Sequence, residues 1–260
     1  MPAFYEHDGK GYLATELTRG PWDPGAQHAG PPAALLGREF ELLPEAADFQ
    51  VCRITFEILR SIPIGPVEVE ARIVRPGRRV QMLEAELRVD GETLMIARAW
   101  RLRTAPVDLP ADAVAIPPGP ALPSEPGPST FLPSGHDVGY HSAMELRFSS
   151  GAFTELGPAT AWLRMRHPLV EGEEPTPLQR TLIAADVGNG ISAVLDWRRH
   201  VFINVDLSVH LERMPEGEWV CVDAVTIPHE HGIGTTESVL FDQRGRIGRA
   251  AQSLLLAERD

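Results

Sequence analysis

Several features that mark special classes of protein are scarce or missing in this chain of 260 residues. Only two cysteines are present, Cys52 and Cys221. They lie far apart in strand-like contexts, so we expect two buried thiols in a reducing compartment rather than a disulfide. No apolar run approaches the ~20 residues that span a bilayer. The N-terminus, MPAFYEHDGKGYL, has neither a basic start nor an apolar core, so we do not expect a signal peptide. These absences predict a cytoplasmic protein without membrane association.

Basic residues are also scarce relative to acidic ones, and the formal net charge is −12 at pH 7. This balance argues against nucleic-acid binding, which depends on neutralising phosphates. An anionic small molecule is still compatible with it, because arginines can cluster locally, as in RPGRR (75–79) and WRRH (197–200). The glycine-rich motifs of nucleotide sites and the G-x-S-x-G motif of serine hydrolases are missing as well.

The first part of the chain has the pattern of one helix followed by antiparallel strands. Prolines suited to a first helical turn open residues 31–43, and apolar residues then recur at helical spacing. Alternating apolar and polar residues joined by tight turns predict a meander rather than parallel strands. The predicted strands are 53–63, 67–74, 80–89 and 93–103.

The same order of elements returns after a segment rich in proline. Residues 105–135 carry too many prolines for a helix or a central strand, so we interpret them as a linker between residues 1–104 and residues 136–260. In the second part, Thr176 as N-cap and Pro177 predict a helix over 176–190. The predicted strands are 143–151, 159–169, 202–215, 217–227, 234–245 and 247–258. We infer an internal duplication.

A curled antiparallel sheet with one apolar face buries that face by wrapping around an apolar helix. Two such units can pair edge to edge, which removes exposed edges, and the seam between them is a natural cleft for a ligand.

This organisation resembles a known fold and family. The chain is similar to acyl-CoA thioesterases of type II, which are tandem hotdog proteins of the α+β class with two curled sheets, each wrapped around a central helix. The similarity rests on HAGPPAALL (28–36), residues 59–81, AADVGNGIS (184–192), INVDLSVHL (203–211) and residues 232–255. It implies an enzyme of fatty acid metabolism that hydrolyses an acyl-CoA or acyl-carrier thioester. It also implies a homo-oligomer without cofactor or metal.

In that family an Asp, a Thr or Ser, and a Gln position a water that attacks the thioester carbonyl. The resemblance places the acid at Asp206 and the amide at Gln252, and it places the hydroxyl at Thr226, with Thr235 or Thr236 as alternatives. A carboxylate can act as general base for such a water, and a hydroxyl and an amide can orient it.

Strand alternation places Asp206 on the polar face of its predicted strand, together with Asn204. We interpret Asp186 as a cap or turn residue beside the GNG sequence. His28 has no acidic partner in the sequence, so we expect it to be inert. His229 and His231 have a spacing compatible with a metal, but a third ligand is not evident.

Two other functions remain open at this stage. One is a non-catalytic protein that binds acyl groups or acyl-CoA in the same groove. The other is an enoyl-CoA hydratase or dehydratase, which would need an Asp–His pair.

Overall fold

The computed structural model describes residues 2–110, 113, 116–126 and 135–259. The first half of the chain forms one long helix, α1 (Gly30–Glu41), and two short 3-10 turns, η1 (Glu16–Thr18) and η2 (Ala46–Asp48). Its strands are β1 (Tyr5–His7), β2 (Tyr12–Ala14), β3 (Phe49–Ile58), β4 (Pro66–Arg75), β5 (Val80–Val89) and β6 (Glu92–Arg103).

The second half has three helices, α2 (Tyr140–Ala143), α3 (Pro177–Ala185) and α4 (Gly188–Ile191), within the described residues. Its strands are β7 (Met144–Ser150), β8 (Ala159–Met165), β9 (His200–Asn204), β10 (Asp206–Leu211), β11 (Val220–His229), β12 (Ile233–Asp242) and β13 (Gly245–Glu258). The described part of the predicted linker contains no strand.

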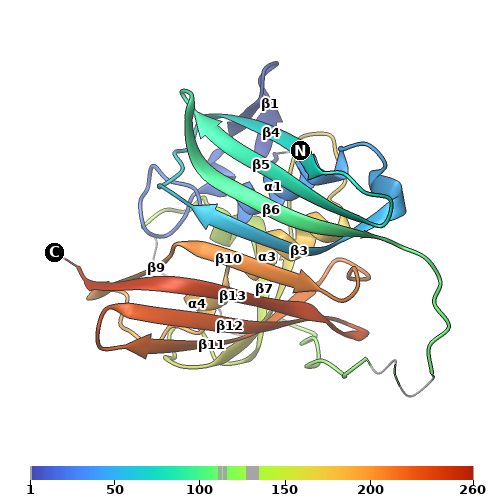
Figure 1. Cartoon of the computed structure of the whole chain (residues 1–260). Helices are drawn as coiled ribbons and strands as arrows, with labels where there is room; N and C mark the ends of the chain where they lie inside the picture. The colour runs from blue at the N-terminus through green and yellow to red at the C-terminus, as the bar shows by residue number, and fades with distance from the viewer. Residues whose placement is uncertain (1, 111–112, 114–115, 127–134, 260) are drawn as a thin grey trace.

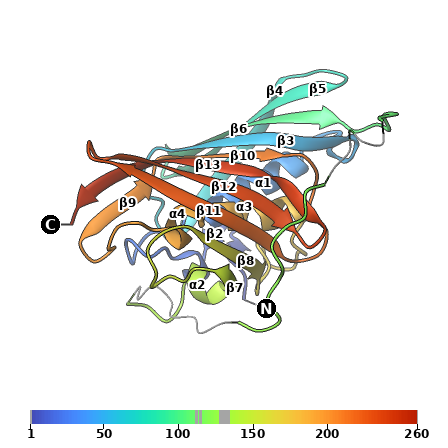
Figure 2. The ribbon, with the colours of Figure 1, turned by 90° about the horizontal axis from the view of Figure 1, so that it is seen from below.

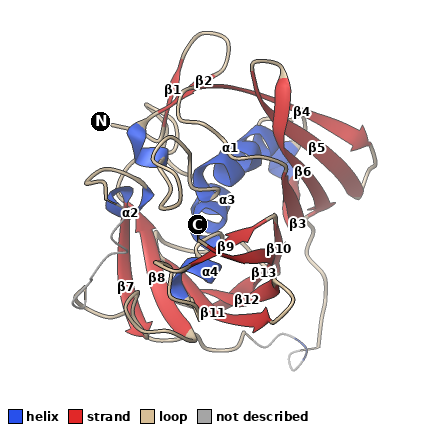
Figure 3. Ribbon diagram, turned by 90° about the vertical axis from the view of Figure 1, so that its left-hand side faces the viewer, coloured by secondary structure: helices blue, strands red, loops and turns tan. Residues whose placement is uncertain are grey.

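All of these strands belong to one antiparallel sheet with the order β1-β2-β4-β5-β6-β3-β10-β13-β12-β11-β8-β7, with β9 paired to β13. The two halves join where β3 pairs with β10, in a register that sets Ile54 opposite Val209 and Phe56 opposite Leu207. Figure 1 shows the two halves meeting at this seam, and Figure 3 shows the sheet curled around α1 and α3. The seam is the edge-to-edge pairing that the sequence predicts.

The two long helices pack directly on each other inside the curled sheet, and small residues allow the close approach. A Cβ on Gly30, at the start of α1, would lie 2.6 Å from the carbonyl oxygen of Ile183 near the end of α3. A Cβ on Gly37 would overlap the side chain of Leu182. At the opposite end of the pair, Thr176 and Gln179 both donate to the carboxylate of Glu41, at 2.8 and 3.2 Å. The helices therefore run antiparallel.

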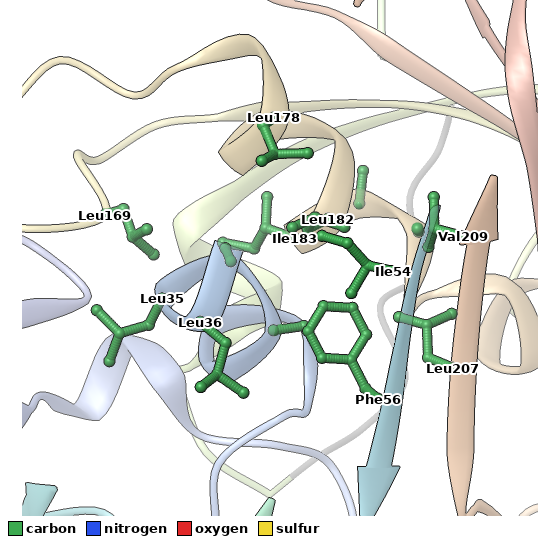
Figure 4. Close-up of a cluster of buried hydrophobic side chains, with 14 of the residues drawn as sticks. Leu35, Leu36, Ile54, Phe56, Leu169, Leu178, Leu182, Ile183, Leu207 and Val209 are labelled. Atoms are coloured by element: carbon green, nitrogen blue, oxygen red, sulfur yellow. The ribbon is translucent and has the colours of Figure 1, made fainter. Parts of the chain in front are cut away.

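The apolar core is shared by both halves. Helical and strand side chains from each half meet at the seam, as Figure 4 shows. The fully or nearly fully buried members include Leu35, Leu36, Ile54, Phe56, Leu182, Ile183, Leu207 and Val209. Burying each such side chain contributes ~1.5–3 kcal/mol, so the seam is part of the main core rather than a weak contact between domains.

Two predicted elements differ from the structure. The helix expected over 176–190 begins as predicted, with Thr176 as N-cap and a capping box to Gln179, but α3 ends at Ala185. Asp186 is its C-cap, and the short helix α4 follows, close to β9 and β11 (Figure 2). The prediction of one strand over 202–215 is wrong, because it breaks at Val205 into β9 and β10. Both breaks place polar side chains at the seam.

Candidate active site

A buried carboxylate stands at the junction of the two halves. Asp186 is only 3% exposed, because it follows the last residue of the core helix α3. Its Oδ1 accepts hydrogen bonds from Asn204 Nδ2 at 2.9 Å and from Gln252 Nε2 at 3.3 Å. Its Oδ2 lies 3.1 Å from Nδ1 of His28. Three polar side chains therefore converge on one acid.

These four side chains come from separate elements. His28 belongs to the loop before α1 in the first half, whereas Asn204 ends β9 and Gln252 lies on the inner face of β13. Gln252 also fixes the backbone around the acid. Its Nε2 donates to the carbonyl oxygen of Asp186 at 3.2 Å, and its Oε1 accepts from the amide of Asn189 in α4 at 3.1 Å. The cluster thus exists only where the halves meet.

Burial sets the protonation of the cluster. Burial raises the pKa of Asp186 to about 7, while hydrogen bonds from Asn204, the Gly30 amide and Gln252 pull it in the other direction. Burial also lowers the pKa of His28 to about 3, so this imidazole is neutral near pH 7. An acid that titrates near neutrality in a buried polar cluster is well suited to general acid–base catalysis.

Neighbouring groups hold the His28 ring in place. The imidazole stacks on the ring of Tyr140, with centroids 3.8 Å apart and an interplanar angle of 2°. The Gly30 amide donates to Nδ1 at 3.1 Å. Within the described part of the chain, Nε2 has no hydrogen-bond partner. Because Nδ1 also faces Asp186, the pair can share one proton, carried either by the carboxyl group or by the imidazole.

The structure brings only one of the three predicted catalytic residues into this cluster, Gln252. The carboxylate of Asp206 instead accepts a hydrogen bond from the backbone amide of Ser253 at 2.6 Å. The break at Val205, which is 49% exposed, shifts the alternation of inward and outward side chains. Asn204 therefore points inward to Asp186, whereas Asp206 points outward, and the expectation that the two share a face is wrong.

Thr226 lies nearby but does not contact the acid. Its hydroxyl is buried and lies 2.8 Å from both Ser192 Oγ and Thr236 Oγ1. Thr236 lies directly opposite Gln252 in the pairing of β12 with β13, so this hydroxyl chain adjoins Gln252 in the sheet, beneath Gly188 of α4. Thr235, the other hydroxyl considered, is exposed on the opposite face of β12.

Comparisons with known proteins place the chain in a family. The model of the acyl-CoA thioesterase N-terminal domain matches residues 18–102, and the model of the C-terminal domain matches residues 110–256. The chain belongs to the acyl-CoA thioesterase family. It is a thioester hydrolase, and the resemblance inferred from the sequence is confirmed. A search of curated protein sequences finds no match.

Solved structures show the fold of this thioesterase. A hotdog protein of Alicyclobacillus acidocaldarius is 16% identical, with a TM-score of 0.69, covering 98% of this chain and 96% of that chain. The acyl-CoA thioesterase II TesB2 of Mycobacterium marinum is 16% identical, with a TM-score of 0.65 and 91% of each chain covered. The tesB protein of Mycobacterium avium subs paratuberculosis is 15% identical, with a TM-score of 0.65, covering 98% of this chain and 96% of that chain. The thioesterase therefore has a hotdog fold.

Sequence reasoning missed Asp186, Asn204 and His28 as members of the cluster. Asp186 does cap a helix, as expected, but the same break in the helix aims its carboxylate at the seam. The sequence carried one signal, an acid directly between an apolar helix and GNG. The partner of His28 comes from the other half of the thioesterase, so no local pattern could reveal it.

Two cavities of the thioesterase open onto the cluster and share Trp22, His28 and Asn189. The first has a volume of about 70 Å³, and its walls are mainly apolar and aromatic. The second has a volume of about 430 Å³; its walls are also mainly apolar, but they include Asp186, Asn204 and polar side chains of the first half. A substrate that spans both cavities would pass His28, which lines both, with Asp186 in the wall of the second.

The described residues contain no group of three or more His, Cys, Asp or Glu side chains that could hold a metal ion. His229 and His231 are exposed at the turn between β11 and β12, away from the acid. Among the described helices, none is both long and apolar enough to cross a membrane.

Proposed function

We propose that this protein is a double-hotdog acyl-CoA thioesterase in which a water at the seam attacks the thioester, with Asp186 as the general base. The observation that carries the proposal is the buried cluster of Asp186, Asn204 and Gln252 at the junction of two cavities. Gln252 remains in the site, but in this mechanism it orients the carboxylate rather than the water. Asp186 takes the place of the acid, and Asn204 takes the place of the hydroxyl.

The proposed reaction begins with an ionised Asp186, which removes a proton from water as the oxygen attacks the thioester carbonyl. The amides of Asn204 and Gln252 hold the carboxylate in one orientation, so the base is positioned before the substrate binds. The tetrahedral intermediate then collapses, the C–S bond breaks, and the CoA thiolate leaves.

The proton then has a route to the leaving group. The protonated carboxyl group of Asp186 donates it to Nδ1 of His28, and the proton on Nε2 moves to the thiolate sulfur. This relay returns Asp186 to its ionised form, leaves neutral His28 with its proton on Nδ1, and yields free acid and CoA; proton exchange with water then restores the starting tautomer of His28. The stacked Tyr140 keeps the imidazole aligned for both transfers.

Charge near the cavities supports a CoA substrate despite the net charge of −12. The guanidinium of Arg259 lies over the rings of Trp22 and Trp197, at 5.5 and 6.0 Å from their centroids, and that of Arg198 lies 5.9 Å from Trp197. The backbone of Arg259 is hydrogen-bonded to that of Arg199. Because Trp22 lines both cavities, Arg259 also lies beside the cavity that contains Asp186, and we propose that this arginine binds a phosphate group of CoA. Association of copies remains a prediction of the resemblance.

The test is release of free thiol from acyl-CoAs of varied acyl groups by the wild-type protein and two variants. Gln252→Ala should lower kcat by at least about tenfold, because the acid loses an orienting partner. Thr235→Ala removes an exposed hydroxyl from the same sheet and should leave kcat unchanged. Release from none of the substrates, or wild-type turnover by Gln252→Ala, would contradict the proposal.

The pair of Asp186 and His28 also favours a second candidate, hydration of an enoyl-CoA. That reaction needs an acid–base pair beside the thioester, and the structure supplies the partner for His28 that the sequence lacks. Loss of the double bond of crotonyl-CoA without release of thiol would support hydration. Thiol release without hydration would leave hydrolysis as the function.

A further inference from the structure

We infer that the apolar cavity beside His28 binds the acyl group and selects compact acyl groups that carry an aromatic ring, such as arylacetyl thioesters. The inference rests on the proposed hydrolysis and goes further by naming the substrate class. Its basis is the composition of the two cavities, the rings that line the first of them, and the position of the acid between them.

The two cavities differ in a way that assigns one to the pantetheine arm of CoA and the other to the acyl group. The cavity that contains Asp186 and Asn204 combines apolar walls with the polar side chains of Asp23, Gln27 and Arg60, so it suits the amide-bearing pantetheine arm better than the other cavity does. The other cavity has an apolar floor formed by Met144, Leu146 and Val187. Apolar walls favour an acyl group because burying it removes apolar surface from water.

The charged side chain in the apolar cavity does not change this assignment. Arg19 directs its guanidinium nitrogens to the carbonyl oxygens of Pro24 and Val138 and to the carboxylate of Glu16. It therefore holds the surrounding loops together, and its charge is already paired. A carboxylate at the far end of an acyl group would not find a free cation in this guanidinium.

The wall of the apolar cavity is rich in aromatic rings. Five aromatic rings from separate segments line the cavity: Trp22, Tyr140, Phe153, Trp197 and Phe202. Two of them already form an edge-to-face pair, Trp22 and Phe202, with centroids 4.9 Å apart and an interplanar angle of 87°. Ring walls fixed in this way can receive a further ring by edge-to-face or stacked contact.

An aromatic acyl group should bind more tightly in this cavity than an alkyl group that buries a similar area. Ring pairs are favourable beyond the area they bury, by an amount equivalent to about two- to tenfold in affinity. The shared residues Trp22, His28 and Asn189 lie between the arms, so a ring one or two carbons from the carbonyl would reach this wall while the thioester stays at Asp186.

The experiment compares kcat/KM for phenylacetyl-CoA and hexanoyl-CoA in the wild-type protein and two matched variants. The wild type should prefer phenylacetyl-CoA by at least about threefold. Phe202→Leu keeps an apolar wall but removes one ring, and it should reduce this ratio by at least half. Phe241→Leu changes a ring in the separate cluster around Trp162 and should leave the ratio unchanged.

A preference for hexanoyl-CoA, or a ratio that Phe202→Leu does not change, would overturn the inference while leaving hydrolysis intact. Binding of non-hydrolysable thioether analogues by calorimetry separates the two proposals. If neither substrate releases thiol but the phenyl analogue still binds at least about threefold more tightly than the alkyl analogue, hydrolysis fails and the ring-selective pocket stands.

Discussion

The mechanism that we propose depends on the protonation of one side chain, Asp186. Its carboxyl group is buried in the folded chain, which raises its pKa from an ordinary acidic value to about 7. The folded protein therefore keeps a proton that the unfolded chain releases between about pH 4 and pH 7. The stability that this proton contributes is fully present below about pH 4 and is lost as the pH rises through about 7. Function at neutral pH thus costs the fold some stability.

Activity should rise with pH over the range in which this contribution to stability is lost. If ionised Asp186 is the base, kcat/KM rises as the pH passes through the pKa of about 7, and neutral His28 contributes no second titration in this range. The hydrogen bond from Asn204 lowers the pKa of Asp186, so Asn204→Ala should move the midpoint of the profile to higher pH. Measured pH–rate profiles test this shift. Identical midpoints in the two proteins would show that Asn204 does not tune the base.

For single residues, the sequence indicates the orientation of Gln252, because side chains along its strand alternate regularly between the inner and the outer face of the sheet. It was not informative about Asp186 and Asn204. Their orientation depends on where α3 and β9 end, and a one-residue change in a strand moves every later side chain to the other face.

Among the elements, the close contact of α1 with α3 decides whether the cluster can form. The start of α1 carries His28 and the end of α3 carries Asp186, and Gly30 lets these two ends touch. The capping box at Thr176 fixes the other end of α3. Proline, threonine and the spacing of apolar residues predict the positions of the helices well. The contact between the helices depends on the folded sheet, so these local signals do not predict it.

Gly30→Ala should therefore separate the helix ends. The new methyl group would lie 2.6 Å from the carbonyl oxygen of Ile183, which is backbone and cannot rotate away. We expect a loss of about 1–3 kcal/mol in the free energy of unfolding and lower kcat. Gly25→Ala is the matched control, because the atom nearest to its new methyl group, Asp23 Oδ1, lies at an ordinary contact distance of 3.5 Å and its φ is not positive. Urea denaturation and thiol release measure both effects, and equal behaviour of the two variants would contradict this account.

For the whole molecule, the duplication that the sequence predicts is consistent with one continuous sheet curled around two helices. The strands β4, β5 and β6 lie within a few residues of their predicted bounds, because tight turns and alternation are local signals. The short strands β1 and β2 escaped notice because three residues carry no periodic pattern. Their location matters, since Tyr5 bridges to Val170 of the second half and adds a second link between the halves.

The proposed active site requires both halves, because one half supplies His28 and the other supplies the acid and both amides. Substitution of Asp186 therefore tests its role as general base more directly than substitution of another residue. Asp206 offers a matched comparison, because it is an acid on β10 whose side chain points to the outer face of the sheet.

The decisive measurement is kcat for thiol release by Asp186→Asn and Asp206→Asn, with the free energy of unfolding measured for each at pH 8. Asp186→Asn should lower kcat by at least about a hundredfold, as removal of a general base does, and it should unfold no more easily than the wild type because a buried charge is gone. Asp206→Asn should retain turnover within a few-fold of the wild type. The account would be contradicted if Asp206→Asn lost activity while Asp186→Asn kept it.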